Sequence, residues 1–197
     1  MKIFKSLLLL TSLGVVFSFT QNSTSTLPTS HDETLITWKG KKVTGSHEGT
    51  ISLKSGALEY DSKSILKGGS FAIDMSTIAV TDLTGNPANN LRGHLLSQDF
   101  FNVEKHPEAT FIITNVEKEF ASDGPYDVTG DLTIKGITKE LKFPVAVTRR
   151  HGKLVARAKI KVDRIAYDIK YGSGQFFENL GDKMIDDHFE LNVTLVN

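Results

Sequence analysis

Histidines are the first residues of this chain that could do chemistry, because imidazole binds metals and acts as a general base. The chain has six of them: His31, His47, His94, His106, His151 and His188. No pair has the HxH, HxxH or HExxH spacing of metal sites, and the six are scattered over the chain with no group of carboxylates that sequence alone can bring together with them. The composition contains no cysteine, which excludes disulfides, thiol catalysis and thiolate metal sites. We therefore predict that the chain has no metal site.

Acidic side chains offer a second kind of chemistry, because carboxylates whose pKa values differ can act as a general acid and a general base. Asp186, Asp187 and Glu190 surround His188, and further aspartates separate the early apolar runs. Such positions are typical of turns and polar strand faces, where carboxylates are solvated or bond to the turn. The sequence has no GxSxG motif and no phosphate-binding glycine loop. We therefore predict no catalytic residue and no enzymatic activity.

The elements that must position any site are strands, because apolar and polar residues alternate along most of the chain. We expect strands within residues 35–43, 49–53, 57–60, 69–75, 110–116, 126–135, 137–147, 154–163 and 188–195. One short helix is expected between two strands, near Pro87 to Gln98. Short connections such as Lys135-Gly136 favour antiparallel neighbours. The sequence thus indicates an all-β fold with about eight antiparallel strands.

The apolar face of such a sheet has to be covered, which a sandwich or a closed barrel can do. We favour an antiparallel, eight-stranded, extended β-barrel, which is wide enough for filling side chains or for one slender ligand. An outer-membrane barrel shows the same alternation, but it would carry aromatic girdles. The single Trp and four Tyr of this chain argue against that alternative.

The first 20 residues resemble a secretory signal peptide. Lys2 and Lys5 precede an apolar run from Leu7 to Phe19, which is shorter than the roughly 20 residues needed to span a bilayer. We therefore expect an exported protein, periplasmic or extracellular, with no membrane span in the mature chain. Residues 21–32 are predicted to be a flexible leader and residues 33–197 a single barrel domain. The formal net charge of zero argues against nucleic-acid binding. The sequence does not decide between a monomer and a homodimer.

The segment from Leu91 to Phe111 is the most informative for function. Its apolar residues cannot all lie on one stripe of so short a helix, so some must face a cavity or the end of the sheet. The adjacent pairs Phe100-Phe101 and Phe176-Phe177 would point to both faces of an extended strand. One ring of each pair could then line a cavity mouth. Arg92 and His94 are the nearby polar residues that could meet a ligand head group.

Several ordered motifs resemble the YceI-like family of exported lipid-binding proteins. They include Gly49 to Gly56, His94-Leu-Leu-Ser-Gln-Asp-Phe-Phe101, Lys105-His-Pro107, Gly130-Asp-Leu-Thr-Ile-Lys-Gly-Ile-Thr-Lys139 and the stretch from Asp163-Arg164 to Tyr167. The resemblance spans roughly residues 35–196. It implies a lipocalin-like barrel that holds a long isoprenoid or acyl chain in its apolar interior, with the polar head near the mouth and no catalysis. Where the family often carries Asp, this chain has Arg92, a cation that suits phosphate or carboxylate better.

From these observations we expect non-enzymatic binding, transport or storage of a polyisoprenoid, an isoprenoid quinone or a fatty-acyl lipid in a barrel tunnel, with no required cofactor. The expected tail contacts are Trp38, Phe71, Ile73, Met75, Leu91, Leu95, Phe100, Phe101, Phe111, Ile113, Phe143, Tyr167, Phe176 and Phe177. Arg92 and His94 are the expected head-group contacts. Two alternatives remain: an enzyme at the barrel mouth with His94 as base and Arg92 as anion holder, and a filled barrel acting as a stress or interaction module.

Overall fold

The computed structural model describes residues 24–30, 32–118 and 125–197. The expected secretory signal, residues 1–20, lies outside them. The strands are β1 (Ser25–Pro28), β2 (Leu35–Lys42), β3 (Gly45–Tyr60), β4 (Leu66–Val80), β5 (Glu108–Glu117), β6 (Tyr126–Ile134), β7 (Ile137–Arg150), β8 (Lys153–Asp163) and β9 (Ile185–Val196). The helix α1 (Gly85–Leu96) lies between β4 and β5, and two 3₁₀ turns, η1 (Ile165–Tyr167) and η2 (Gly181–Lys183), lie between β8 and β9.

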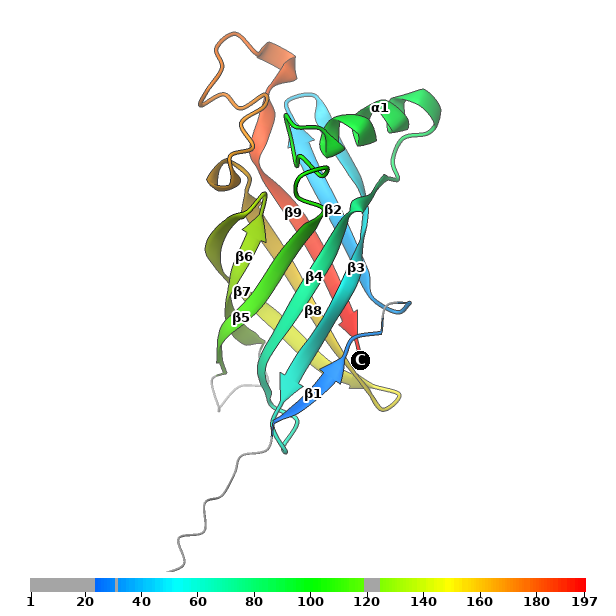
Figure 1. Cartoon of the computed structure of the whole chain (residues 1–197), viewed down its shortest axis with the longest axis vertical. Helices are drawn as coiled ribbons and strands as arrows, with labels where there is room; N and C mark the ends of the chain where they lie inside the picture. The colour runs from blue at the N-terminus through cyan, green and yellow to red at the C-terminus, as the bar shows by residue number, and fades with distance from the viewer. Residues whose placement is uncertain (1–23, 31, 119–124) are drawn as a thin grey trace, which may run out of the picture.

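The strands β2 to β9 form a closed antiparallel barrel. From β3 to β9 each strand pairs with the next one along the chain, and β2 closes the ring by pairing with both β3 and β9 (Figure 1). The prediction of an eight-stranded antiparallel barrel with one helix between two strands is confirmed. Closure leaves no long sheet edge exposed along the wall.

The short strand β1 differs from the predicted flexible leader of residues 21–32 at residues 25–30, whereas residues 21–23 and 31 lie outside the described residues. Ser25 to Pro28 pair with Tyr60 to Ala57 at the end of β3, on the same edge that β2 uses further along. Thr29 Oγ1 donates to the carbonyl of Gly56, and the Ser30 amide donates to the carbonyl of Val196. The polar composition of this segment concealed its pairing, because main-chain bonds hold it to the barrel.

Strand β3 is one long strand where the alternation indicated two. Its register against β4 shifts between Thr50 and Ser52 and again between Leu53 and Ser55. Each irregularity changes the phase of inward and outward residues, which interrupts the alternation in the sequence without ending the strand.

The two ends of the barrel differ. The helix α1, the turns β2–β3 and β6–β7, and the connection from β8 to β9 lie at one end, which we call the α1 end (Figure 1). The C-terminus, β1 and the turn β7–β8 lie at the other. Among the described residues no helix is long and apolar enough to cross a membrane.

Inward-facing side chains form two apolar clusters along the barrel axis. The cluster at the α1 end joins Leu95 of α1 and Phe100 to strand residues such as Met75 and Ile134. The other cluster is centred on residues such as Val128 and Tyr60. The barrel interior is therefore apolar along its length, and α1 packs over one end of it.

Candidate functional site: a cavity inside the barrel

A cavity of about 210 Å³ lies inside the barrel. Every strand from β2 to β9 contributes to its wall, and Leu95 of α1, Phe100, Phe101 and Arg164 line it as well. Almost all of this wall is aliphatic or aromatic carbon, and a single water needs only about 10–15 Å³ of such space. A cavity of this kind offers water few hydrogen-bond partners, so an apolar molecule suits it better.

Most of the predicted tail contacts are brought together on this wall. The residues that line the cavity are Trp38, Phe71, Ile73, Met75, Leu95, Phe100, Phe101, Phe111, Ile113 and Phe143. The strand members were found because they are apolar residues that alternate with polar ones on the interior face. The structure adds many smaller residues that sequence reasoning did not select, such as Val193 and Leu195 of β9 and Ala158 of β8.

Four of the predicted tail contacts do not line the cavity. Leu91 is partly buried and Tyr167 is fully buried, and both pack in the cluster at the α1 end. Phe176 and Phe177 are 47% and 48% exposed. Both of their amides donate to the carbonyl of Ser173, so this pair lies in a turn. Phe176 and Phe177 therefore do not have the extended-strand geometry that was expected of them.

The other aromatic pair closes the cavity beneath α1. The amide of Phe100 donates to the carbonyl of Ser97, and that of Phe101 donates to the carbonyl of Leu95, which forms a tight turn after the helix. The two rings meet edge to face with centroids 5.0 Å apart, and both line the cavity. This turn directs both rings towards the interior.

Arg92, a predicted head-group contact, lies away from the cavity wall. Its Nε donates to the carbonyl of Ile78 at 2.8 Å, and its Nη2 donates to the carbonyl of Ser76 at 2.8 Å. Both acceptors belong to β4, so Arg92 fastens α1 to the barrel. The sequence could not show this contact, because the acceptors are main-chain carbonyls on a distant element.

His94, the second predicted head-group contact, is also absent from the cavity wall. Its ring packs between Phe100, at a centroid distance of 5.6 Å, and Tyr171, at 4.4 Å. Its Nε2 atom is buried and makes no hydrogen bond within the described part of the chain. His94 therefore reaches the cavity only through Phe100, and it joins α1 to the connection between β8 and β9.

Arg164 is a buried, charged residue of the cavity wall that sequence reasoning did not select. Only 1% of it is exposed, and its guanidinium carbon lies 6.0 Å from the centre of the Phe100 ring. Its Nε, Nη1 and Nη2 donate to the carbonyls of Asp186, Ile169 and Ile185 at 2.9, 2.6 and 3.1 Å. Burial lowers the pKa of Arg164, and nearby carboxylates, Asp187 first, oppose that change. An arginine nevertheless stays charged in proteins.

Local strand geometry explains why Arg164 bonds to these carbonyls. The register between β2 and β9 shifts where Gly40 pairs with Phe189 but Lys42 pairs with Ile185. This irregularity frees carbonyls of Ile185 and Asp186 from the ladder, and buried carbonyls need donors. Arg164, at the exit of β8, supplies them. Arg164 had two sequence signals: its place in the stretch from Asp163-Arg164 to Tyr167 that resembles the family, and its position between the end of a strand and an apolar stretch. Neither signal shows that the side chain is buried.

Asp187 is the carboxylate nearest to Arg164. Its Oδ1 lies 3.5 Å from Nη2 of Arg164 and makes no hydrogen bond within the described residues. Its Oδ2 accepts a hydrogen bond from Gln175 Nε2 at 2.7 Å. Burial would raise the pKa of Asp187, but hydrogen bonds from Ser173 and Gln175 and the charge of Arg164 hold it below the ordinary value. Arg164 at the cavity wall is therefore paired with an ionised carboxylate that does not itself line the cavity.

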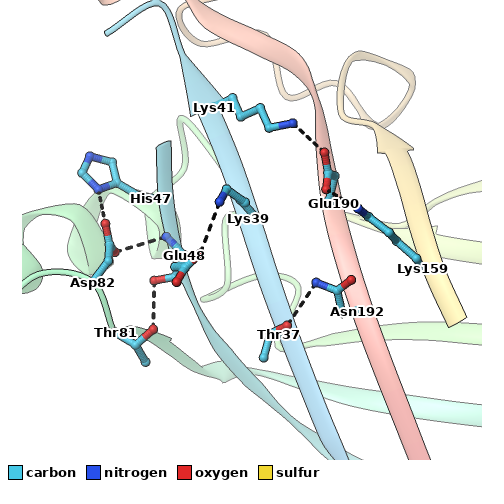
Figure 2. A network of polar contacts seen from close by, with 10 residues as sticks. All are labelled: Thr37, Lys39, Lys41, His47, Glu48, Thr81, Asp82, Lys159, Glu190 and Asn192. Carbon is cyan, nitrogen blue, oxygen red and sulfur yellow. Dashed lines mark hydrogen bonds and ion pairs between the residues drawn. The ribbon is translucent and has the colours of Figure 1, made fainter. Parts of the chain in front are cut away.

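Outside the barrel, ion pairs join neighbouring strands. Glu190 of β9 accepts a hydrogen bond from Lys41 of β2 at 2.6 Å and lies 3.3 Å from Lys159 of β8 (Figure 2). A hydrogen bond of 2.8 Å joins His47 of β3 to Asp82. These side chains are partly or largely exposed, so each pair adds little stability. In the described ranges no group of three histidines and carboxylates lies close enough to hold a metal ion.

The chain is therefore a small, closed, eight-stranded antiparallel β-barrel with an apolar interior cavity and one helix over its end. The chain belongs to the YceI-like family, because the sequence pattern of the YceI-like domain matches residues 26–197. This match confirms the resemblance found in the motifs, and it includes most of β1.

Individual relatives agree with this family. A UPF0312 protein of Pectobacterium atrosepticum is 51% identical over 50 residues, which are 25% of this chain and 24% of that protein. The matched segment therefore spans only about a quarter of that relative's length. The fold is similar to that of BcnA from Burkholderia cenocepacia, with a TM-score of 0.67, 19% identity and coverage of 86% of this chain and 99% of that one. A polyisoprenoid binding domain from Saccharophagus degradans gives a TM-score of 0.62 at 12% identity, covering 86% and 95% of the two chains.

Proposed function

We propose that this protein binds one long apolar chain inside the barrel, without catalysis, and so carries or stores a lipid. The observation that carries this proposal is the apolar cavity, whose wall is built from all eight barrel strands. Each methylene group removed from water contributes roughly 0.8 kcal/mol, so ten of them contribute about 8 kcal/mol before the costs of association. A lipid tail therefore provides enough free energy for binding with few polar contacts.

The candidate ligands are a polyisoprenoid, an isoprenoid quinone and a fatty-acyl lipid. The name of the Saccharophagus degradans domain supports the first of these. The cavity favours a binding role over a barrel filled by its own side chains. The enzyme alternative has less support, because His94 and Arg92 do not line the cavity. We also propose export to the periplasm or beyond, on the signal-like pattern of residues 1–20.

Native mass spectrometry of the purified protein tests the proposed function, followed by organic extraction and mass analysis of any released molecule. We expect a single adduct of defined mass whose extract contains a long apolar chain. The control is the same preparation stripped by unfolding in organic solvent, refolded, and then incubated with prenyl and acyl lipids. A protein that carries no lipid when purified, and that takes up none afterwards, would contradict the proposal.

A further inference from the structure

The α1 end of the cavity contains a buried positive charge. Among the described residues, Arg164 is the only charged side chain that is fully buried, at 1% exposure. Arg164 also lines the cavity, where its guanidinium lies over the ring of Phe100. A ligand chain that fills the apolar part of the cavity would bring its end group near this guanidinium.

The guanidinium has hydrogen-bonding capacity that the protein does not use. It carries five N–H donors. Three of them bond to the carbonyls of Ile169, Ile185 and Asp186, one each from Nη1, Nη2 and Nε. Within the described part of the chain, one N–H on each terminal nitrogen is left without a hydrogen-bonded acceptor. The nearest carboxylate oxygen, Oδ1 of Asp187, is 3.5 Å from Nη2 and is itself without a hydrogen bond.

The charges around Arg164 decide which end group fits. Asp187, Asp186 and Asp163 all act electrostatically on this one guanidinium, in that order of strength. Asp186 and His188 line the cavity together with Arg164, and His188 Nδ1 lies 3.6 Å from Oδ1 of Asp186. Three carboxylates therefore act on the one fully buried cation of the described residues, whereas the nearby cations Arg157 and Lys41 are exposed and Lys41 bonds to Glu190. An anionic group that approached Arg164 would meet this negative excess, whereas an uncharged oxygen would not.

We propose that Arg164 forms a head-group subsite at the cavity wall that selects lipids with an uncharged oxygen, a hydroxyl or a carbonyl, over carboxylates and phosphates. The oxygen would accept hydrogen bonds from the two unused N–H groups of the guanidinium. This inference rests on the proposed function, because it requires the tail to occupy the cavity. The preference for an uncharged head group is the opposite of the one expected from the sequence, where Arg92 favoured a phosphate or a carboxylate.

The test compares ligands that share one tail and differ in head group. The protein is first freed of lipid and loaded with the uncharged fluorescent probe N-phenyl-1-naphthylamine. It is then titrated with dodecanol, dodecanoate or dodecyl phosphate, each at concentrations below its solubility limit and below micelle formation. We expect dodecanol to displace the probe with a Kd at least tenfold lower than that of either anion. Equal or tighter binding of dodecanoate or dodecyl phosphate overturns the head-group inference but leaves the proposed function standing. Failure of all three ligands to bind contradicts the proposed function itself.

A charge variant separates the subsite from the general cost of burying an anion. Asp186→Asn removes one negative charge but keeps an oxygen atom that can accept the hydrogen bond from the main-chain amide of His188. We expect this variant to bind both anions at least threefold more tightly, while dodecanol changes less than twofold. The matched control is Glu117→Gln, which removes an exposed carboxylate at the end of β5 that does not line the cavity. Unchanged anion affinity in Asp186→Asn overturns the inference. Arg164 is left intact because its three main-chain bonds support the fold.

Discussion

Filling the cavity from Gly40 is the most direct perturbation of ligand binding. Gly40 lies on the inward face of β2 together with Ile36 and Trp38, and it lines the cavity. A Cβ atom added there would meet no other atom within 4 Å, and the residue does not have a positive φ. Gly40→Leu should therefore fit the free protein without strain. Because glycine is unfavourable within strands, the free protein should be as stable as the wild type or more stable.

The expected loss of affinity follows from the carbon atoms added. The leucine side chain places four carbons where about four methylene groups of the ligand would lie. At roughly 0.8 kcal/mol per methylene, returning them to water costs about 3 kcal/mol. That corresponds to roughly a hundredfold increase in Kd. The measurement is displacement of N-phenyl-1-naphthylamine by dodecanol, together with thermal unfolding of the free protein.

The matched control is Gly93→Leu on α1. A Cβ atom added at Gly93 would also meet open space, but this residue does not line the cavity. The Kd of this variant for dodecanol should stay within twofold of the wild-type value. The reasoning is refuted if Gly40→Leu binds dodecanol as tightly as Gly93→Leu does while both variants remain folded. Such a result would mean that the ligand lies elsewhere.

Three further predictions concern the fold. Arg92→Met should release α1 from β4 at a cost of about 1–3 kcal/mol, seen as faster amide exchange confined to the helix, because it removes two bonds to carbonyls. Ile169→Ala, at a fully buried site, should lower the free energy of unfolding in urea by about 2–5 kcal/mol, whereas Ile112→Ala, at a site 53% exposed, should change it by less than about 0.5 kcal/mol. Burial raises the pKa of Tyr60 from 10.0 to about 12. The neutral hydroxyl therefore contributes fully to the free energy of unfolding below pH 10, and this contribution is lost as the pH rises towards 12. Tyr60→Phe should therefore resist alkaline unfolding better than the wild type, while Tyr171→Phe, at an exposed position, should not.

The barrel could be predicted from the sequence because each strand has one face towards the apolar interior and one towards solvent, which gives a regular alternation of apolar and polar residues. Each strand from β6 to β9 alternates apolar and polar residues over most of its length, and that pattern specifies which face is interior. The register shifts within β3 break this pattern, so the sequence indicated two strands there. Strand β1 gave no signal, because its stabilising bonds come from the main chain and are independent of side-chain type.

The polar part of the site could not be predicted in the same way. Arg92 and Arg164 look alike in sequence, as single arginines beside apolar residues. One fastens the helix from outside, and the other is buried at the cavity. The difference arises from carbonyls freed by the irregularity in β9, which is a property of pairing between distant strands. Phe176 and Phe177 were misplaced for a related reason, since a turn held by Ser173 replaced the expected strand.

Closure of the ring by β2 and β9 has a consequence for the order of folding. These strands lie near opposite ends of the chain, and Leu35 pairs with Thr194. A nascent chain can form the successive hairpins from β3 to β8 early, but it cannot seal the ring until β9 is available. Contacts of such long sequence separation form slowly. The cavity therefore cannot exist before β9 has been synthesised, so any ligand enters a closed barrel and cannot act as a template for the strands that precede β9.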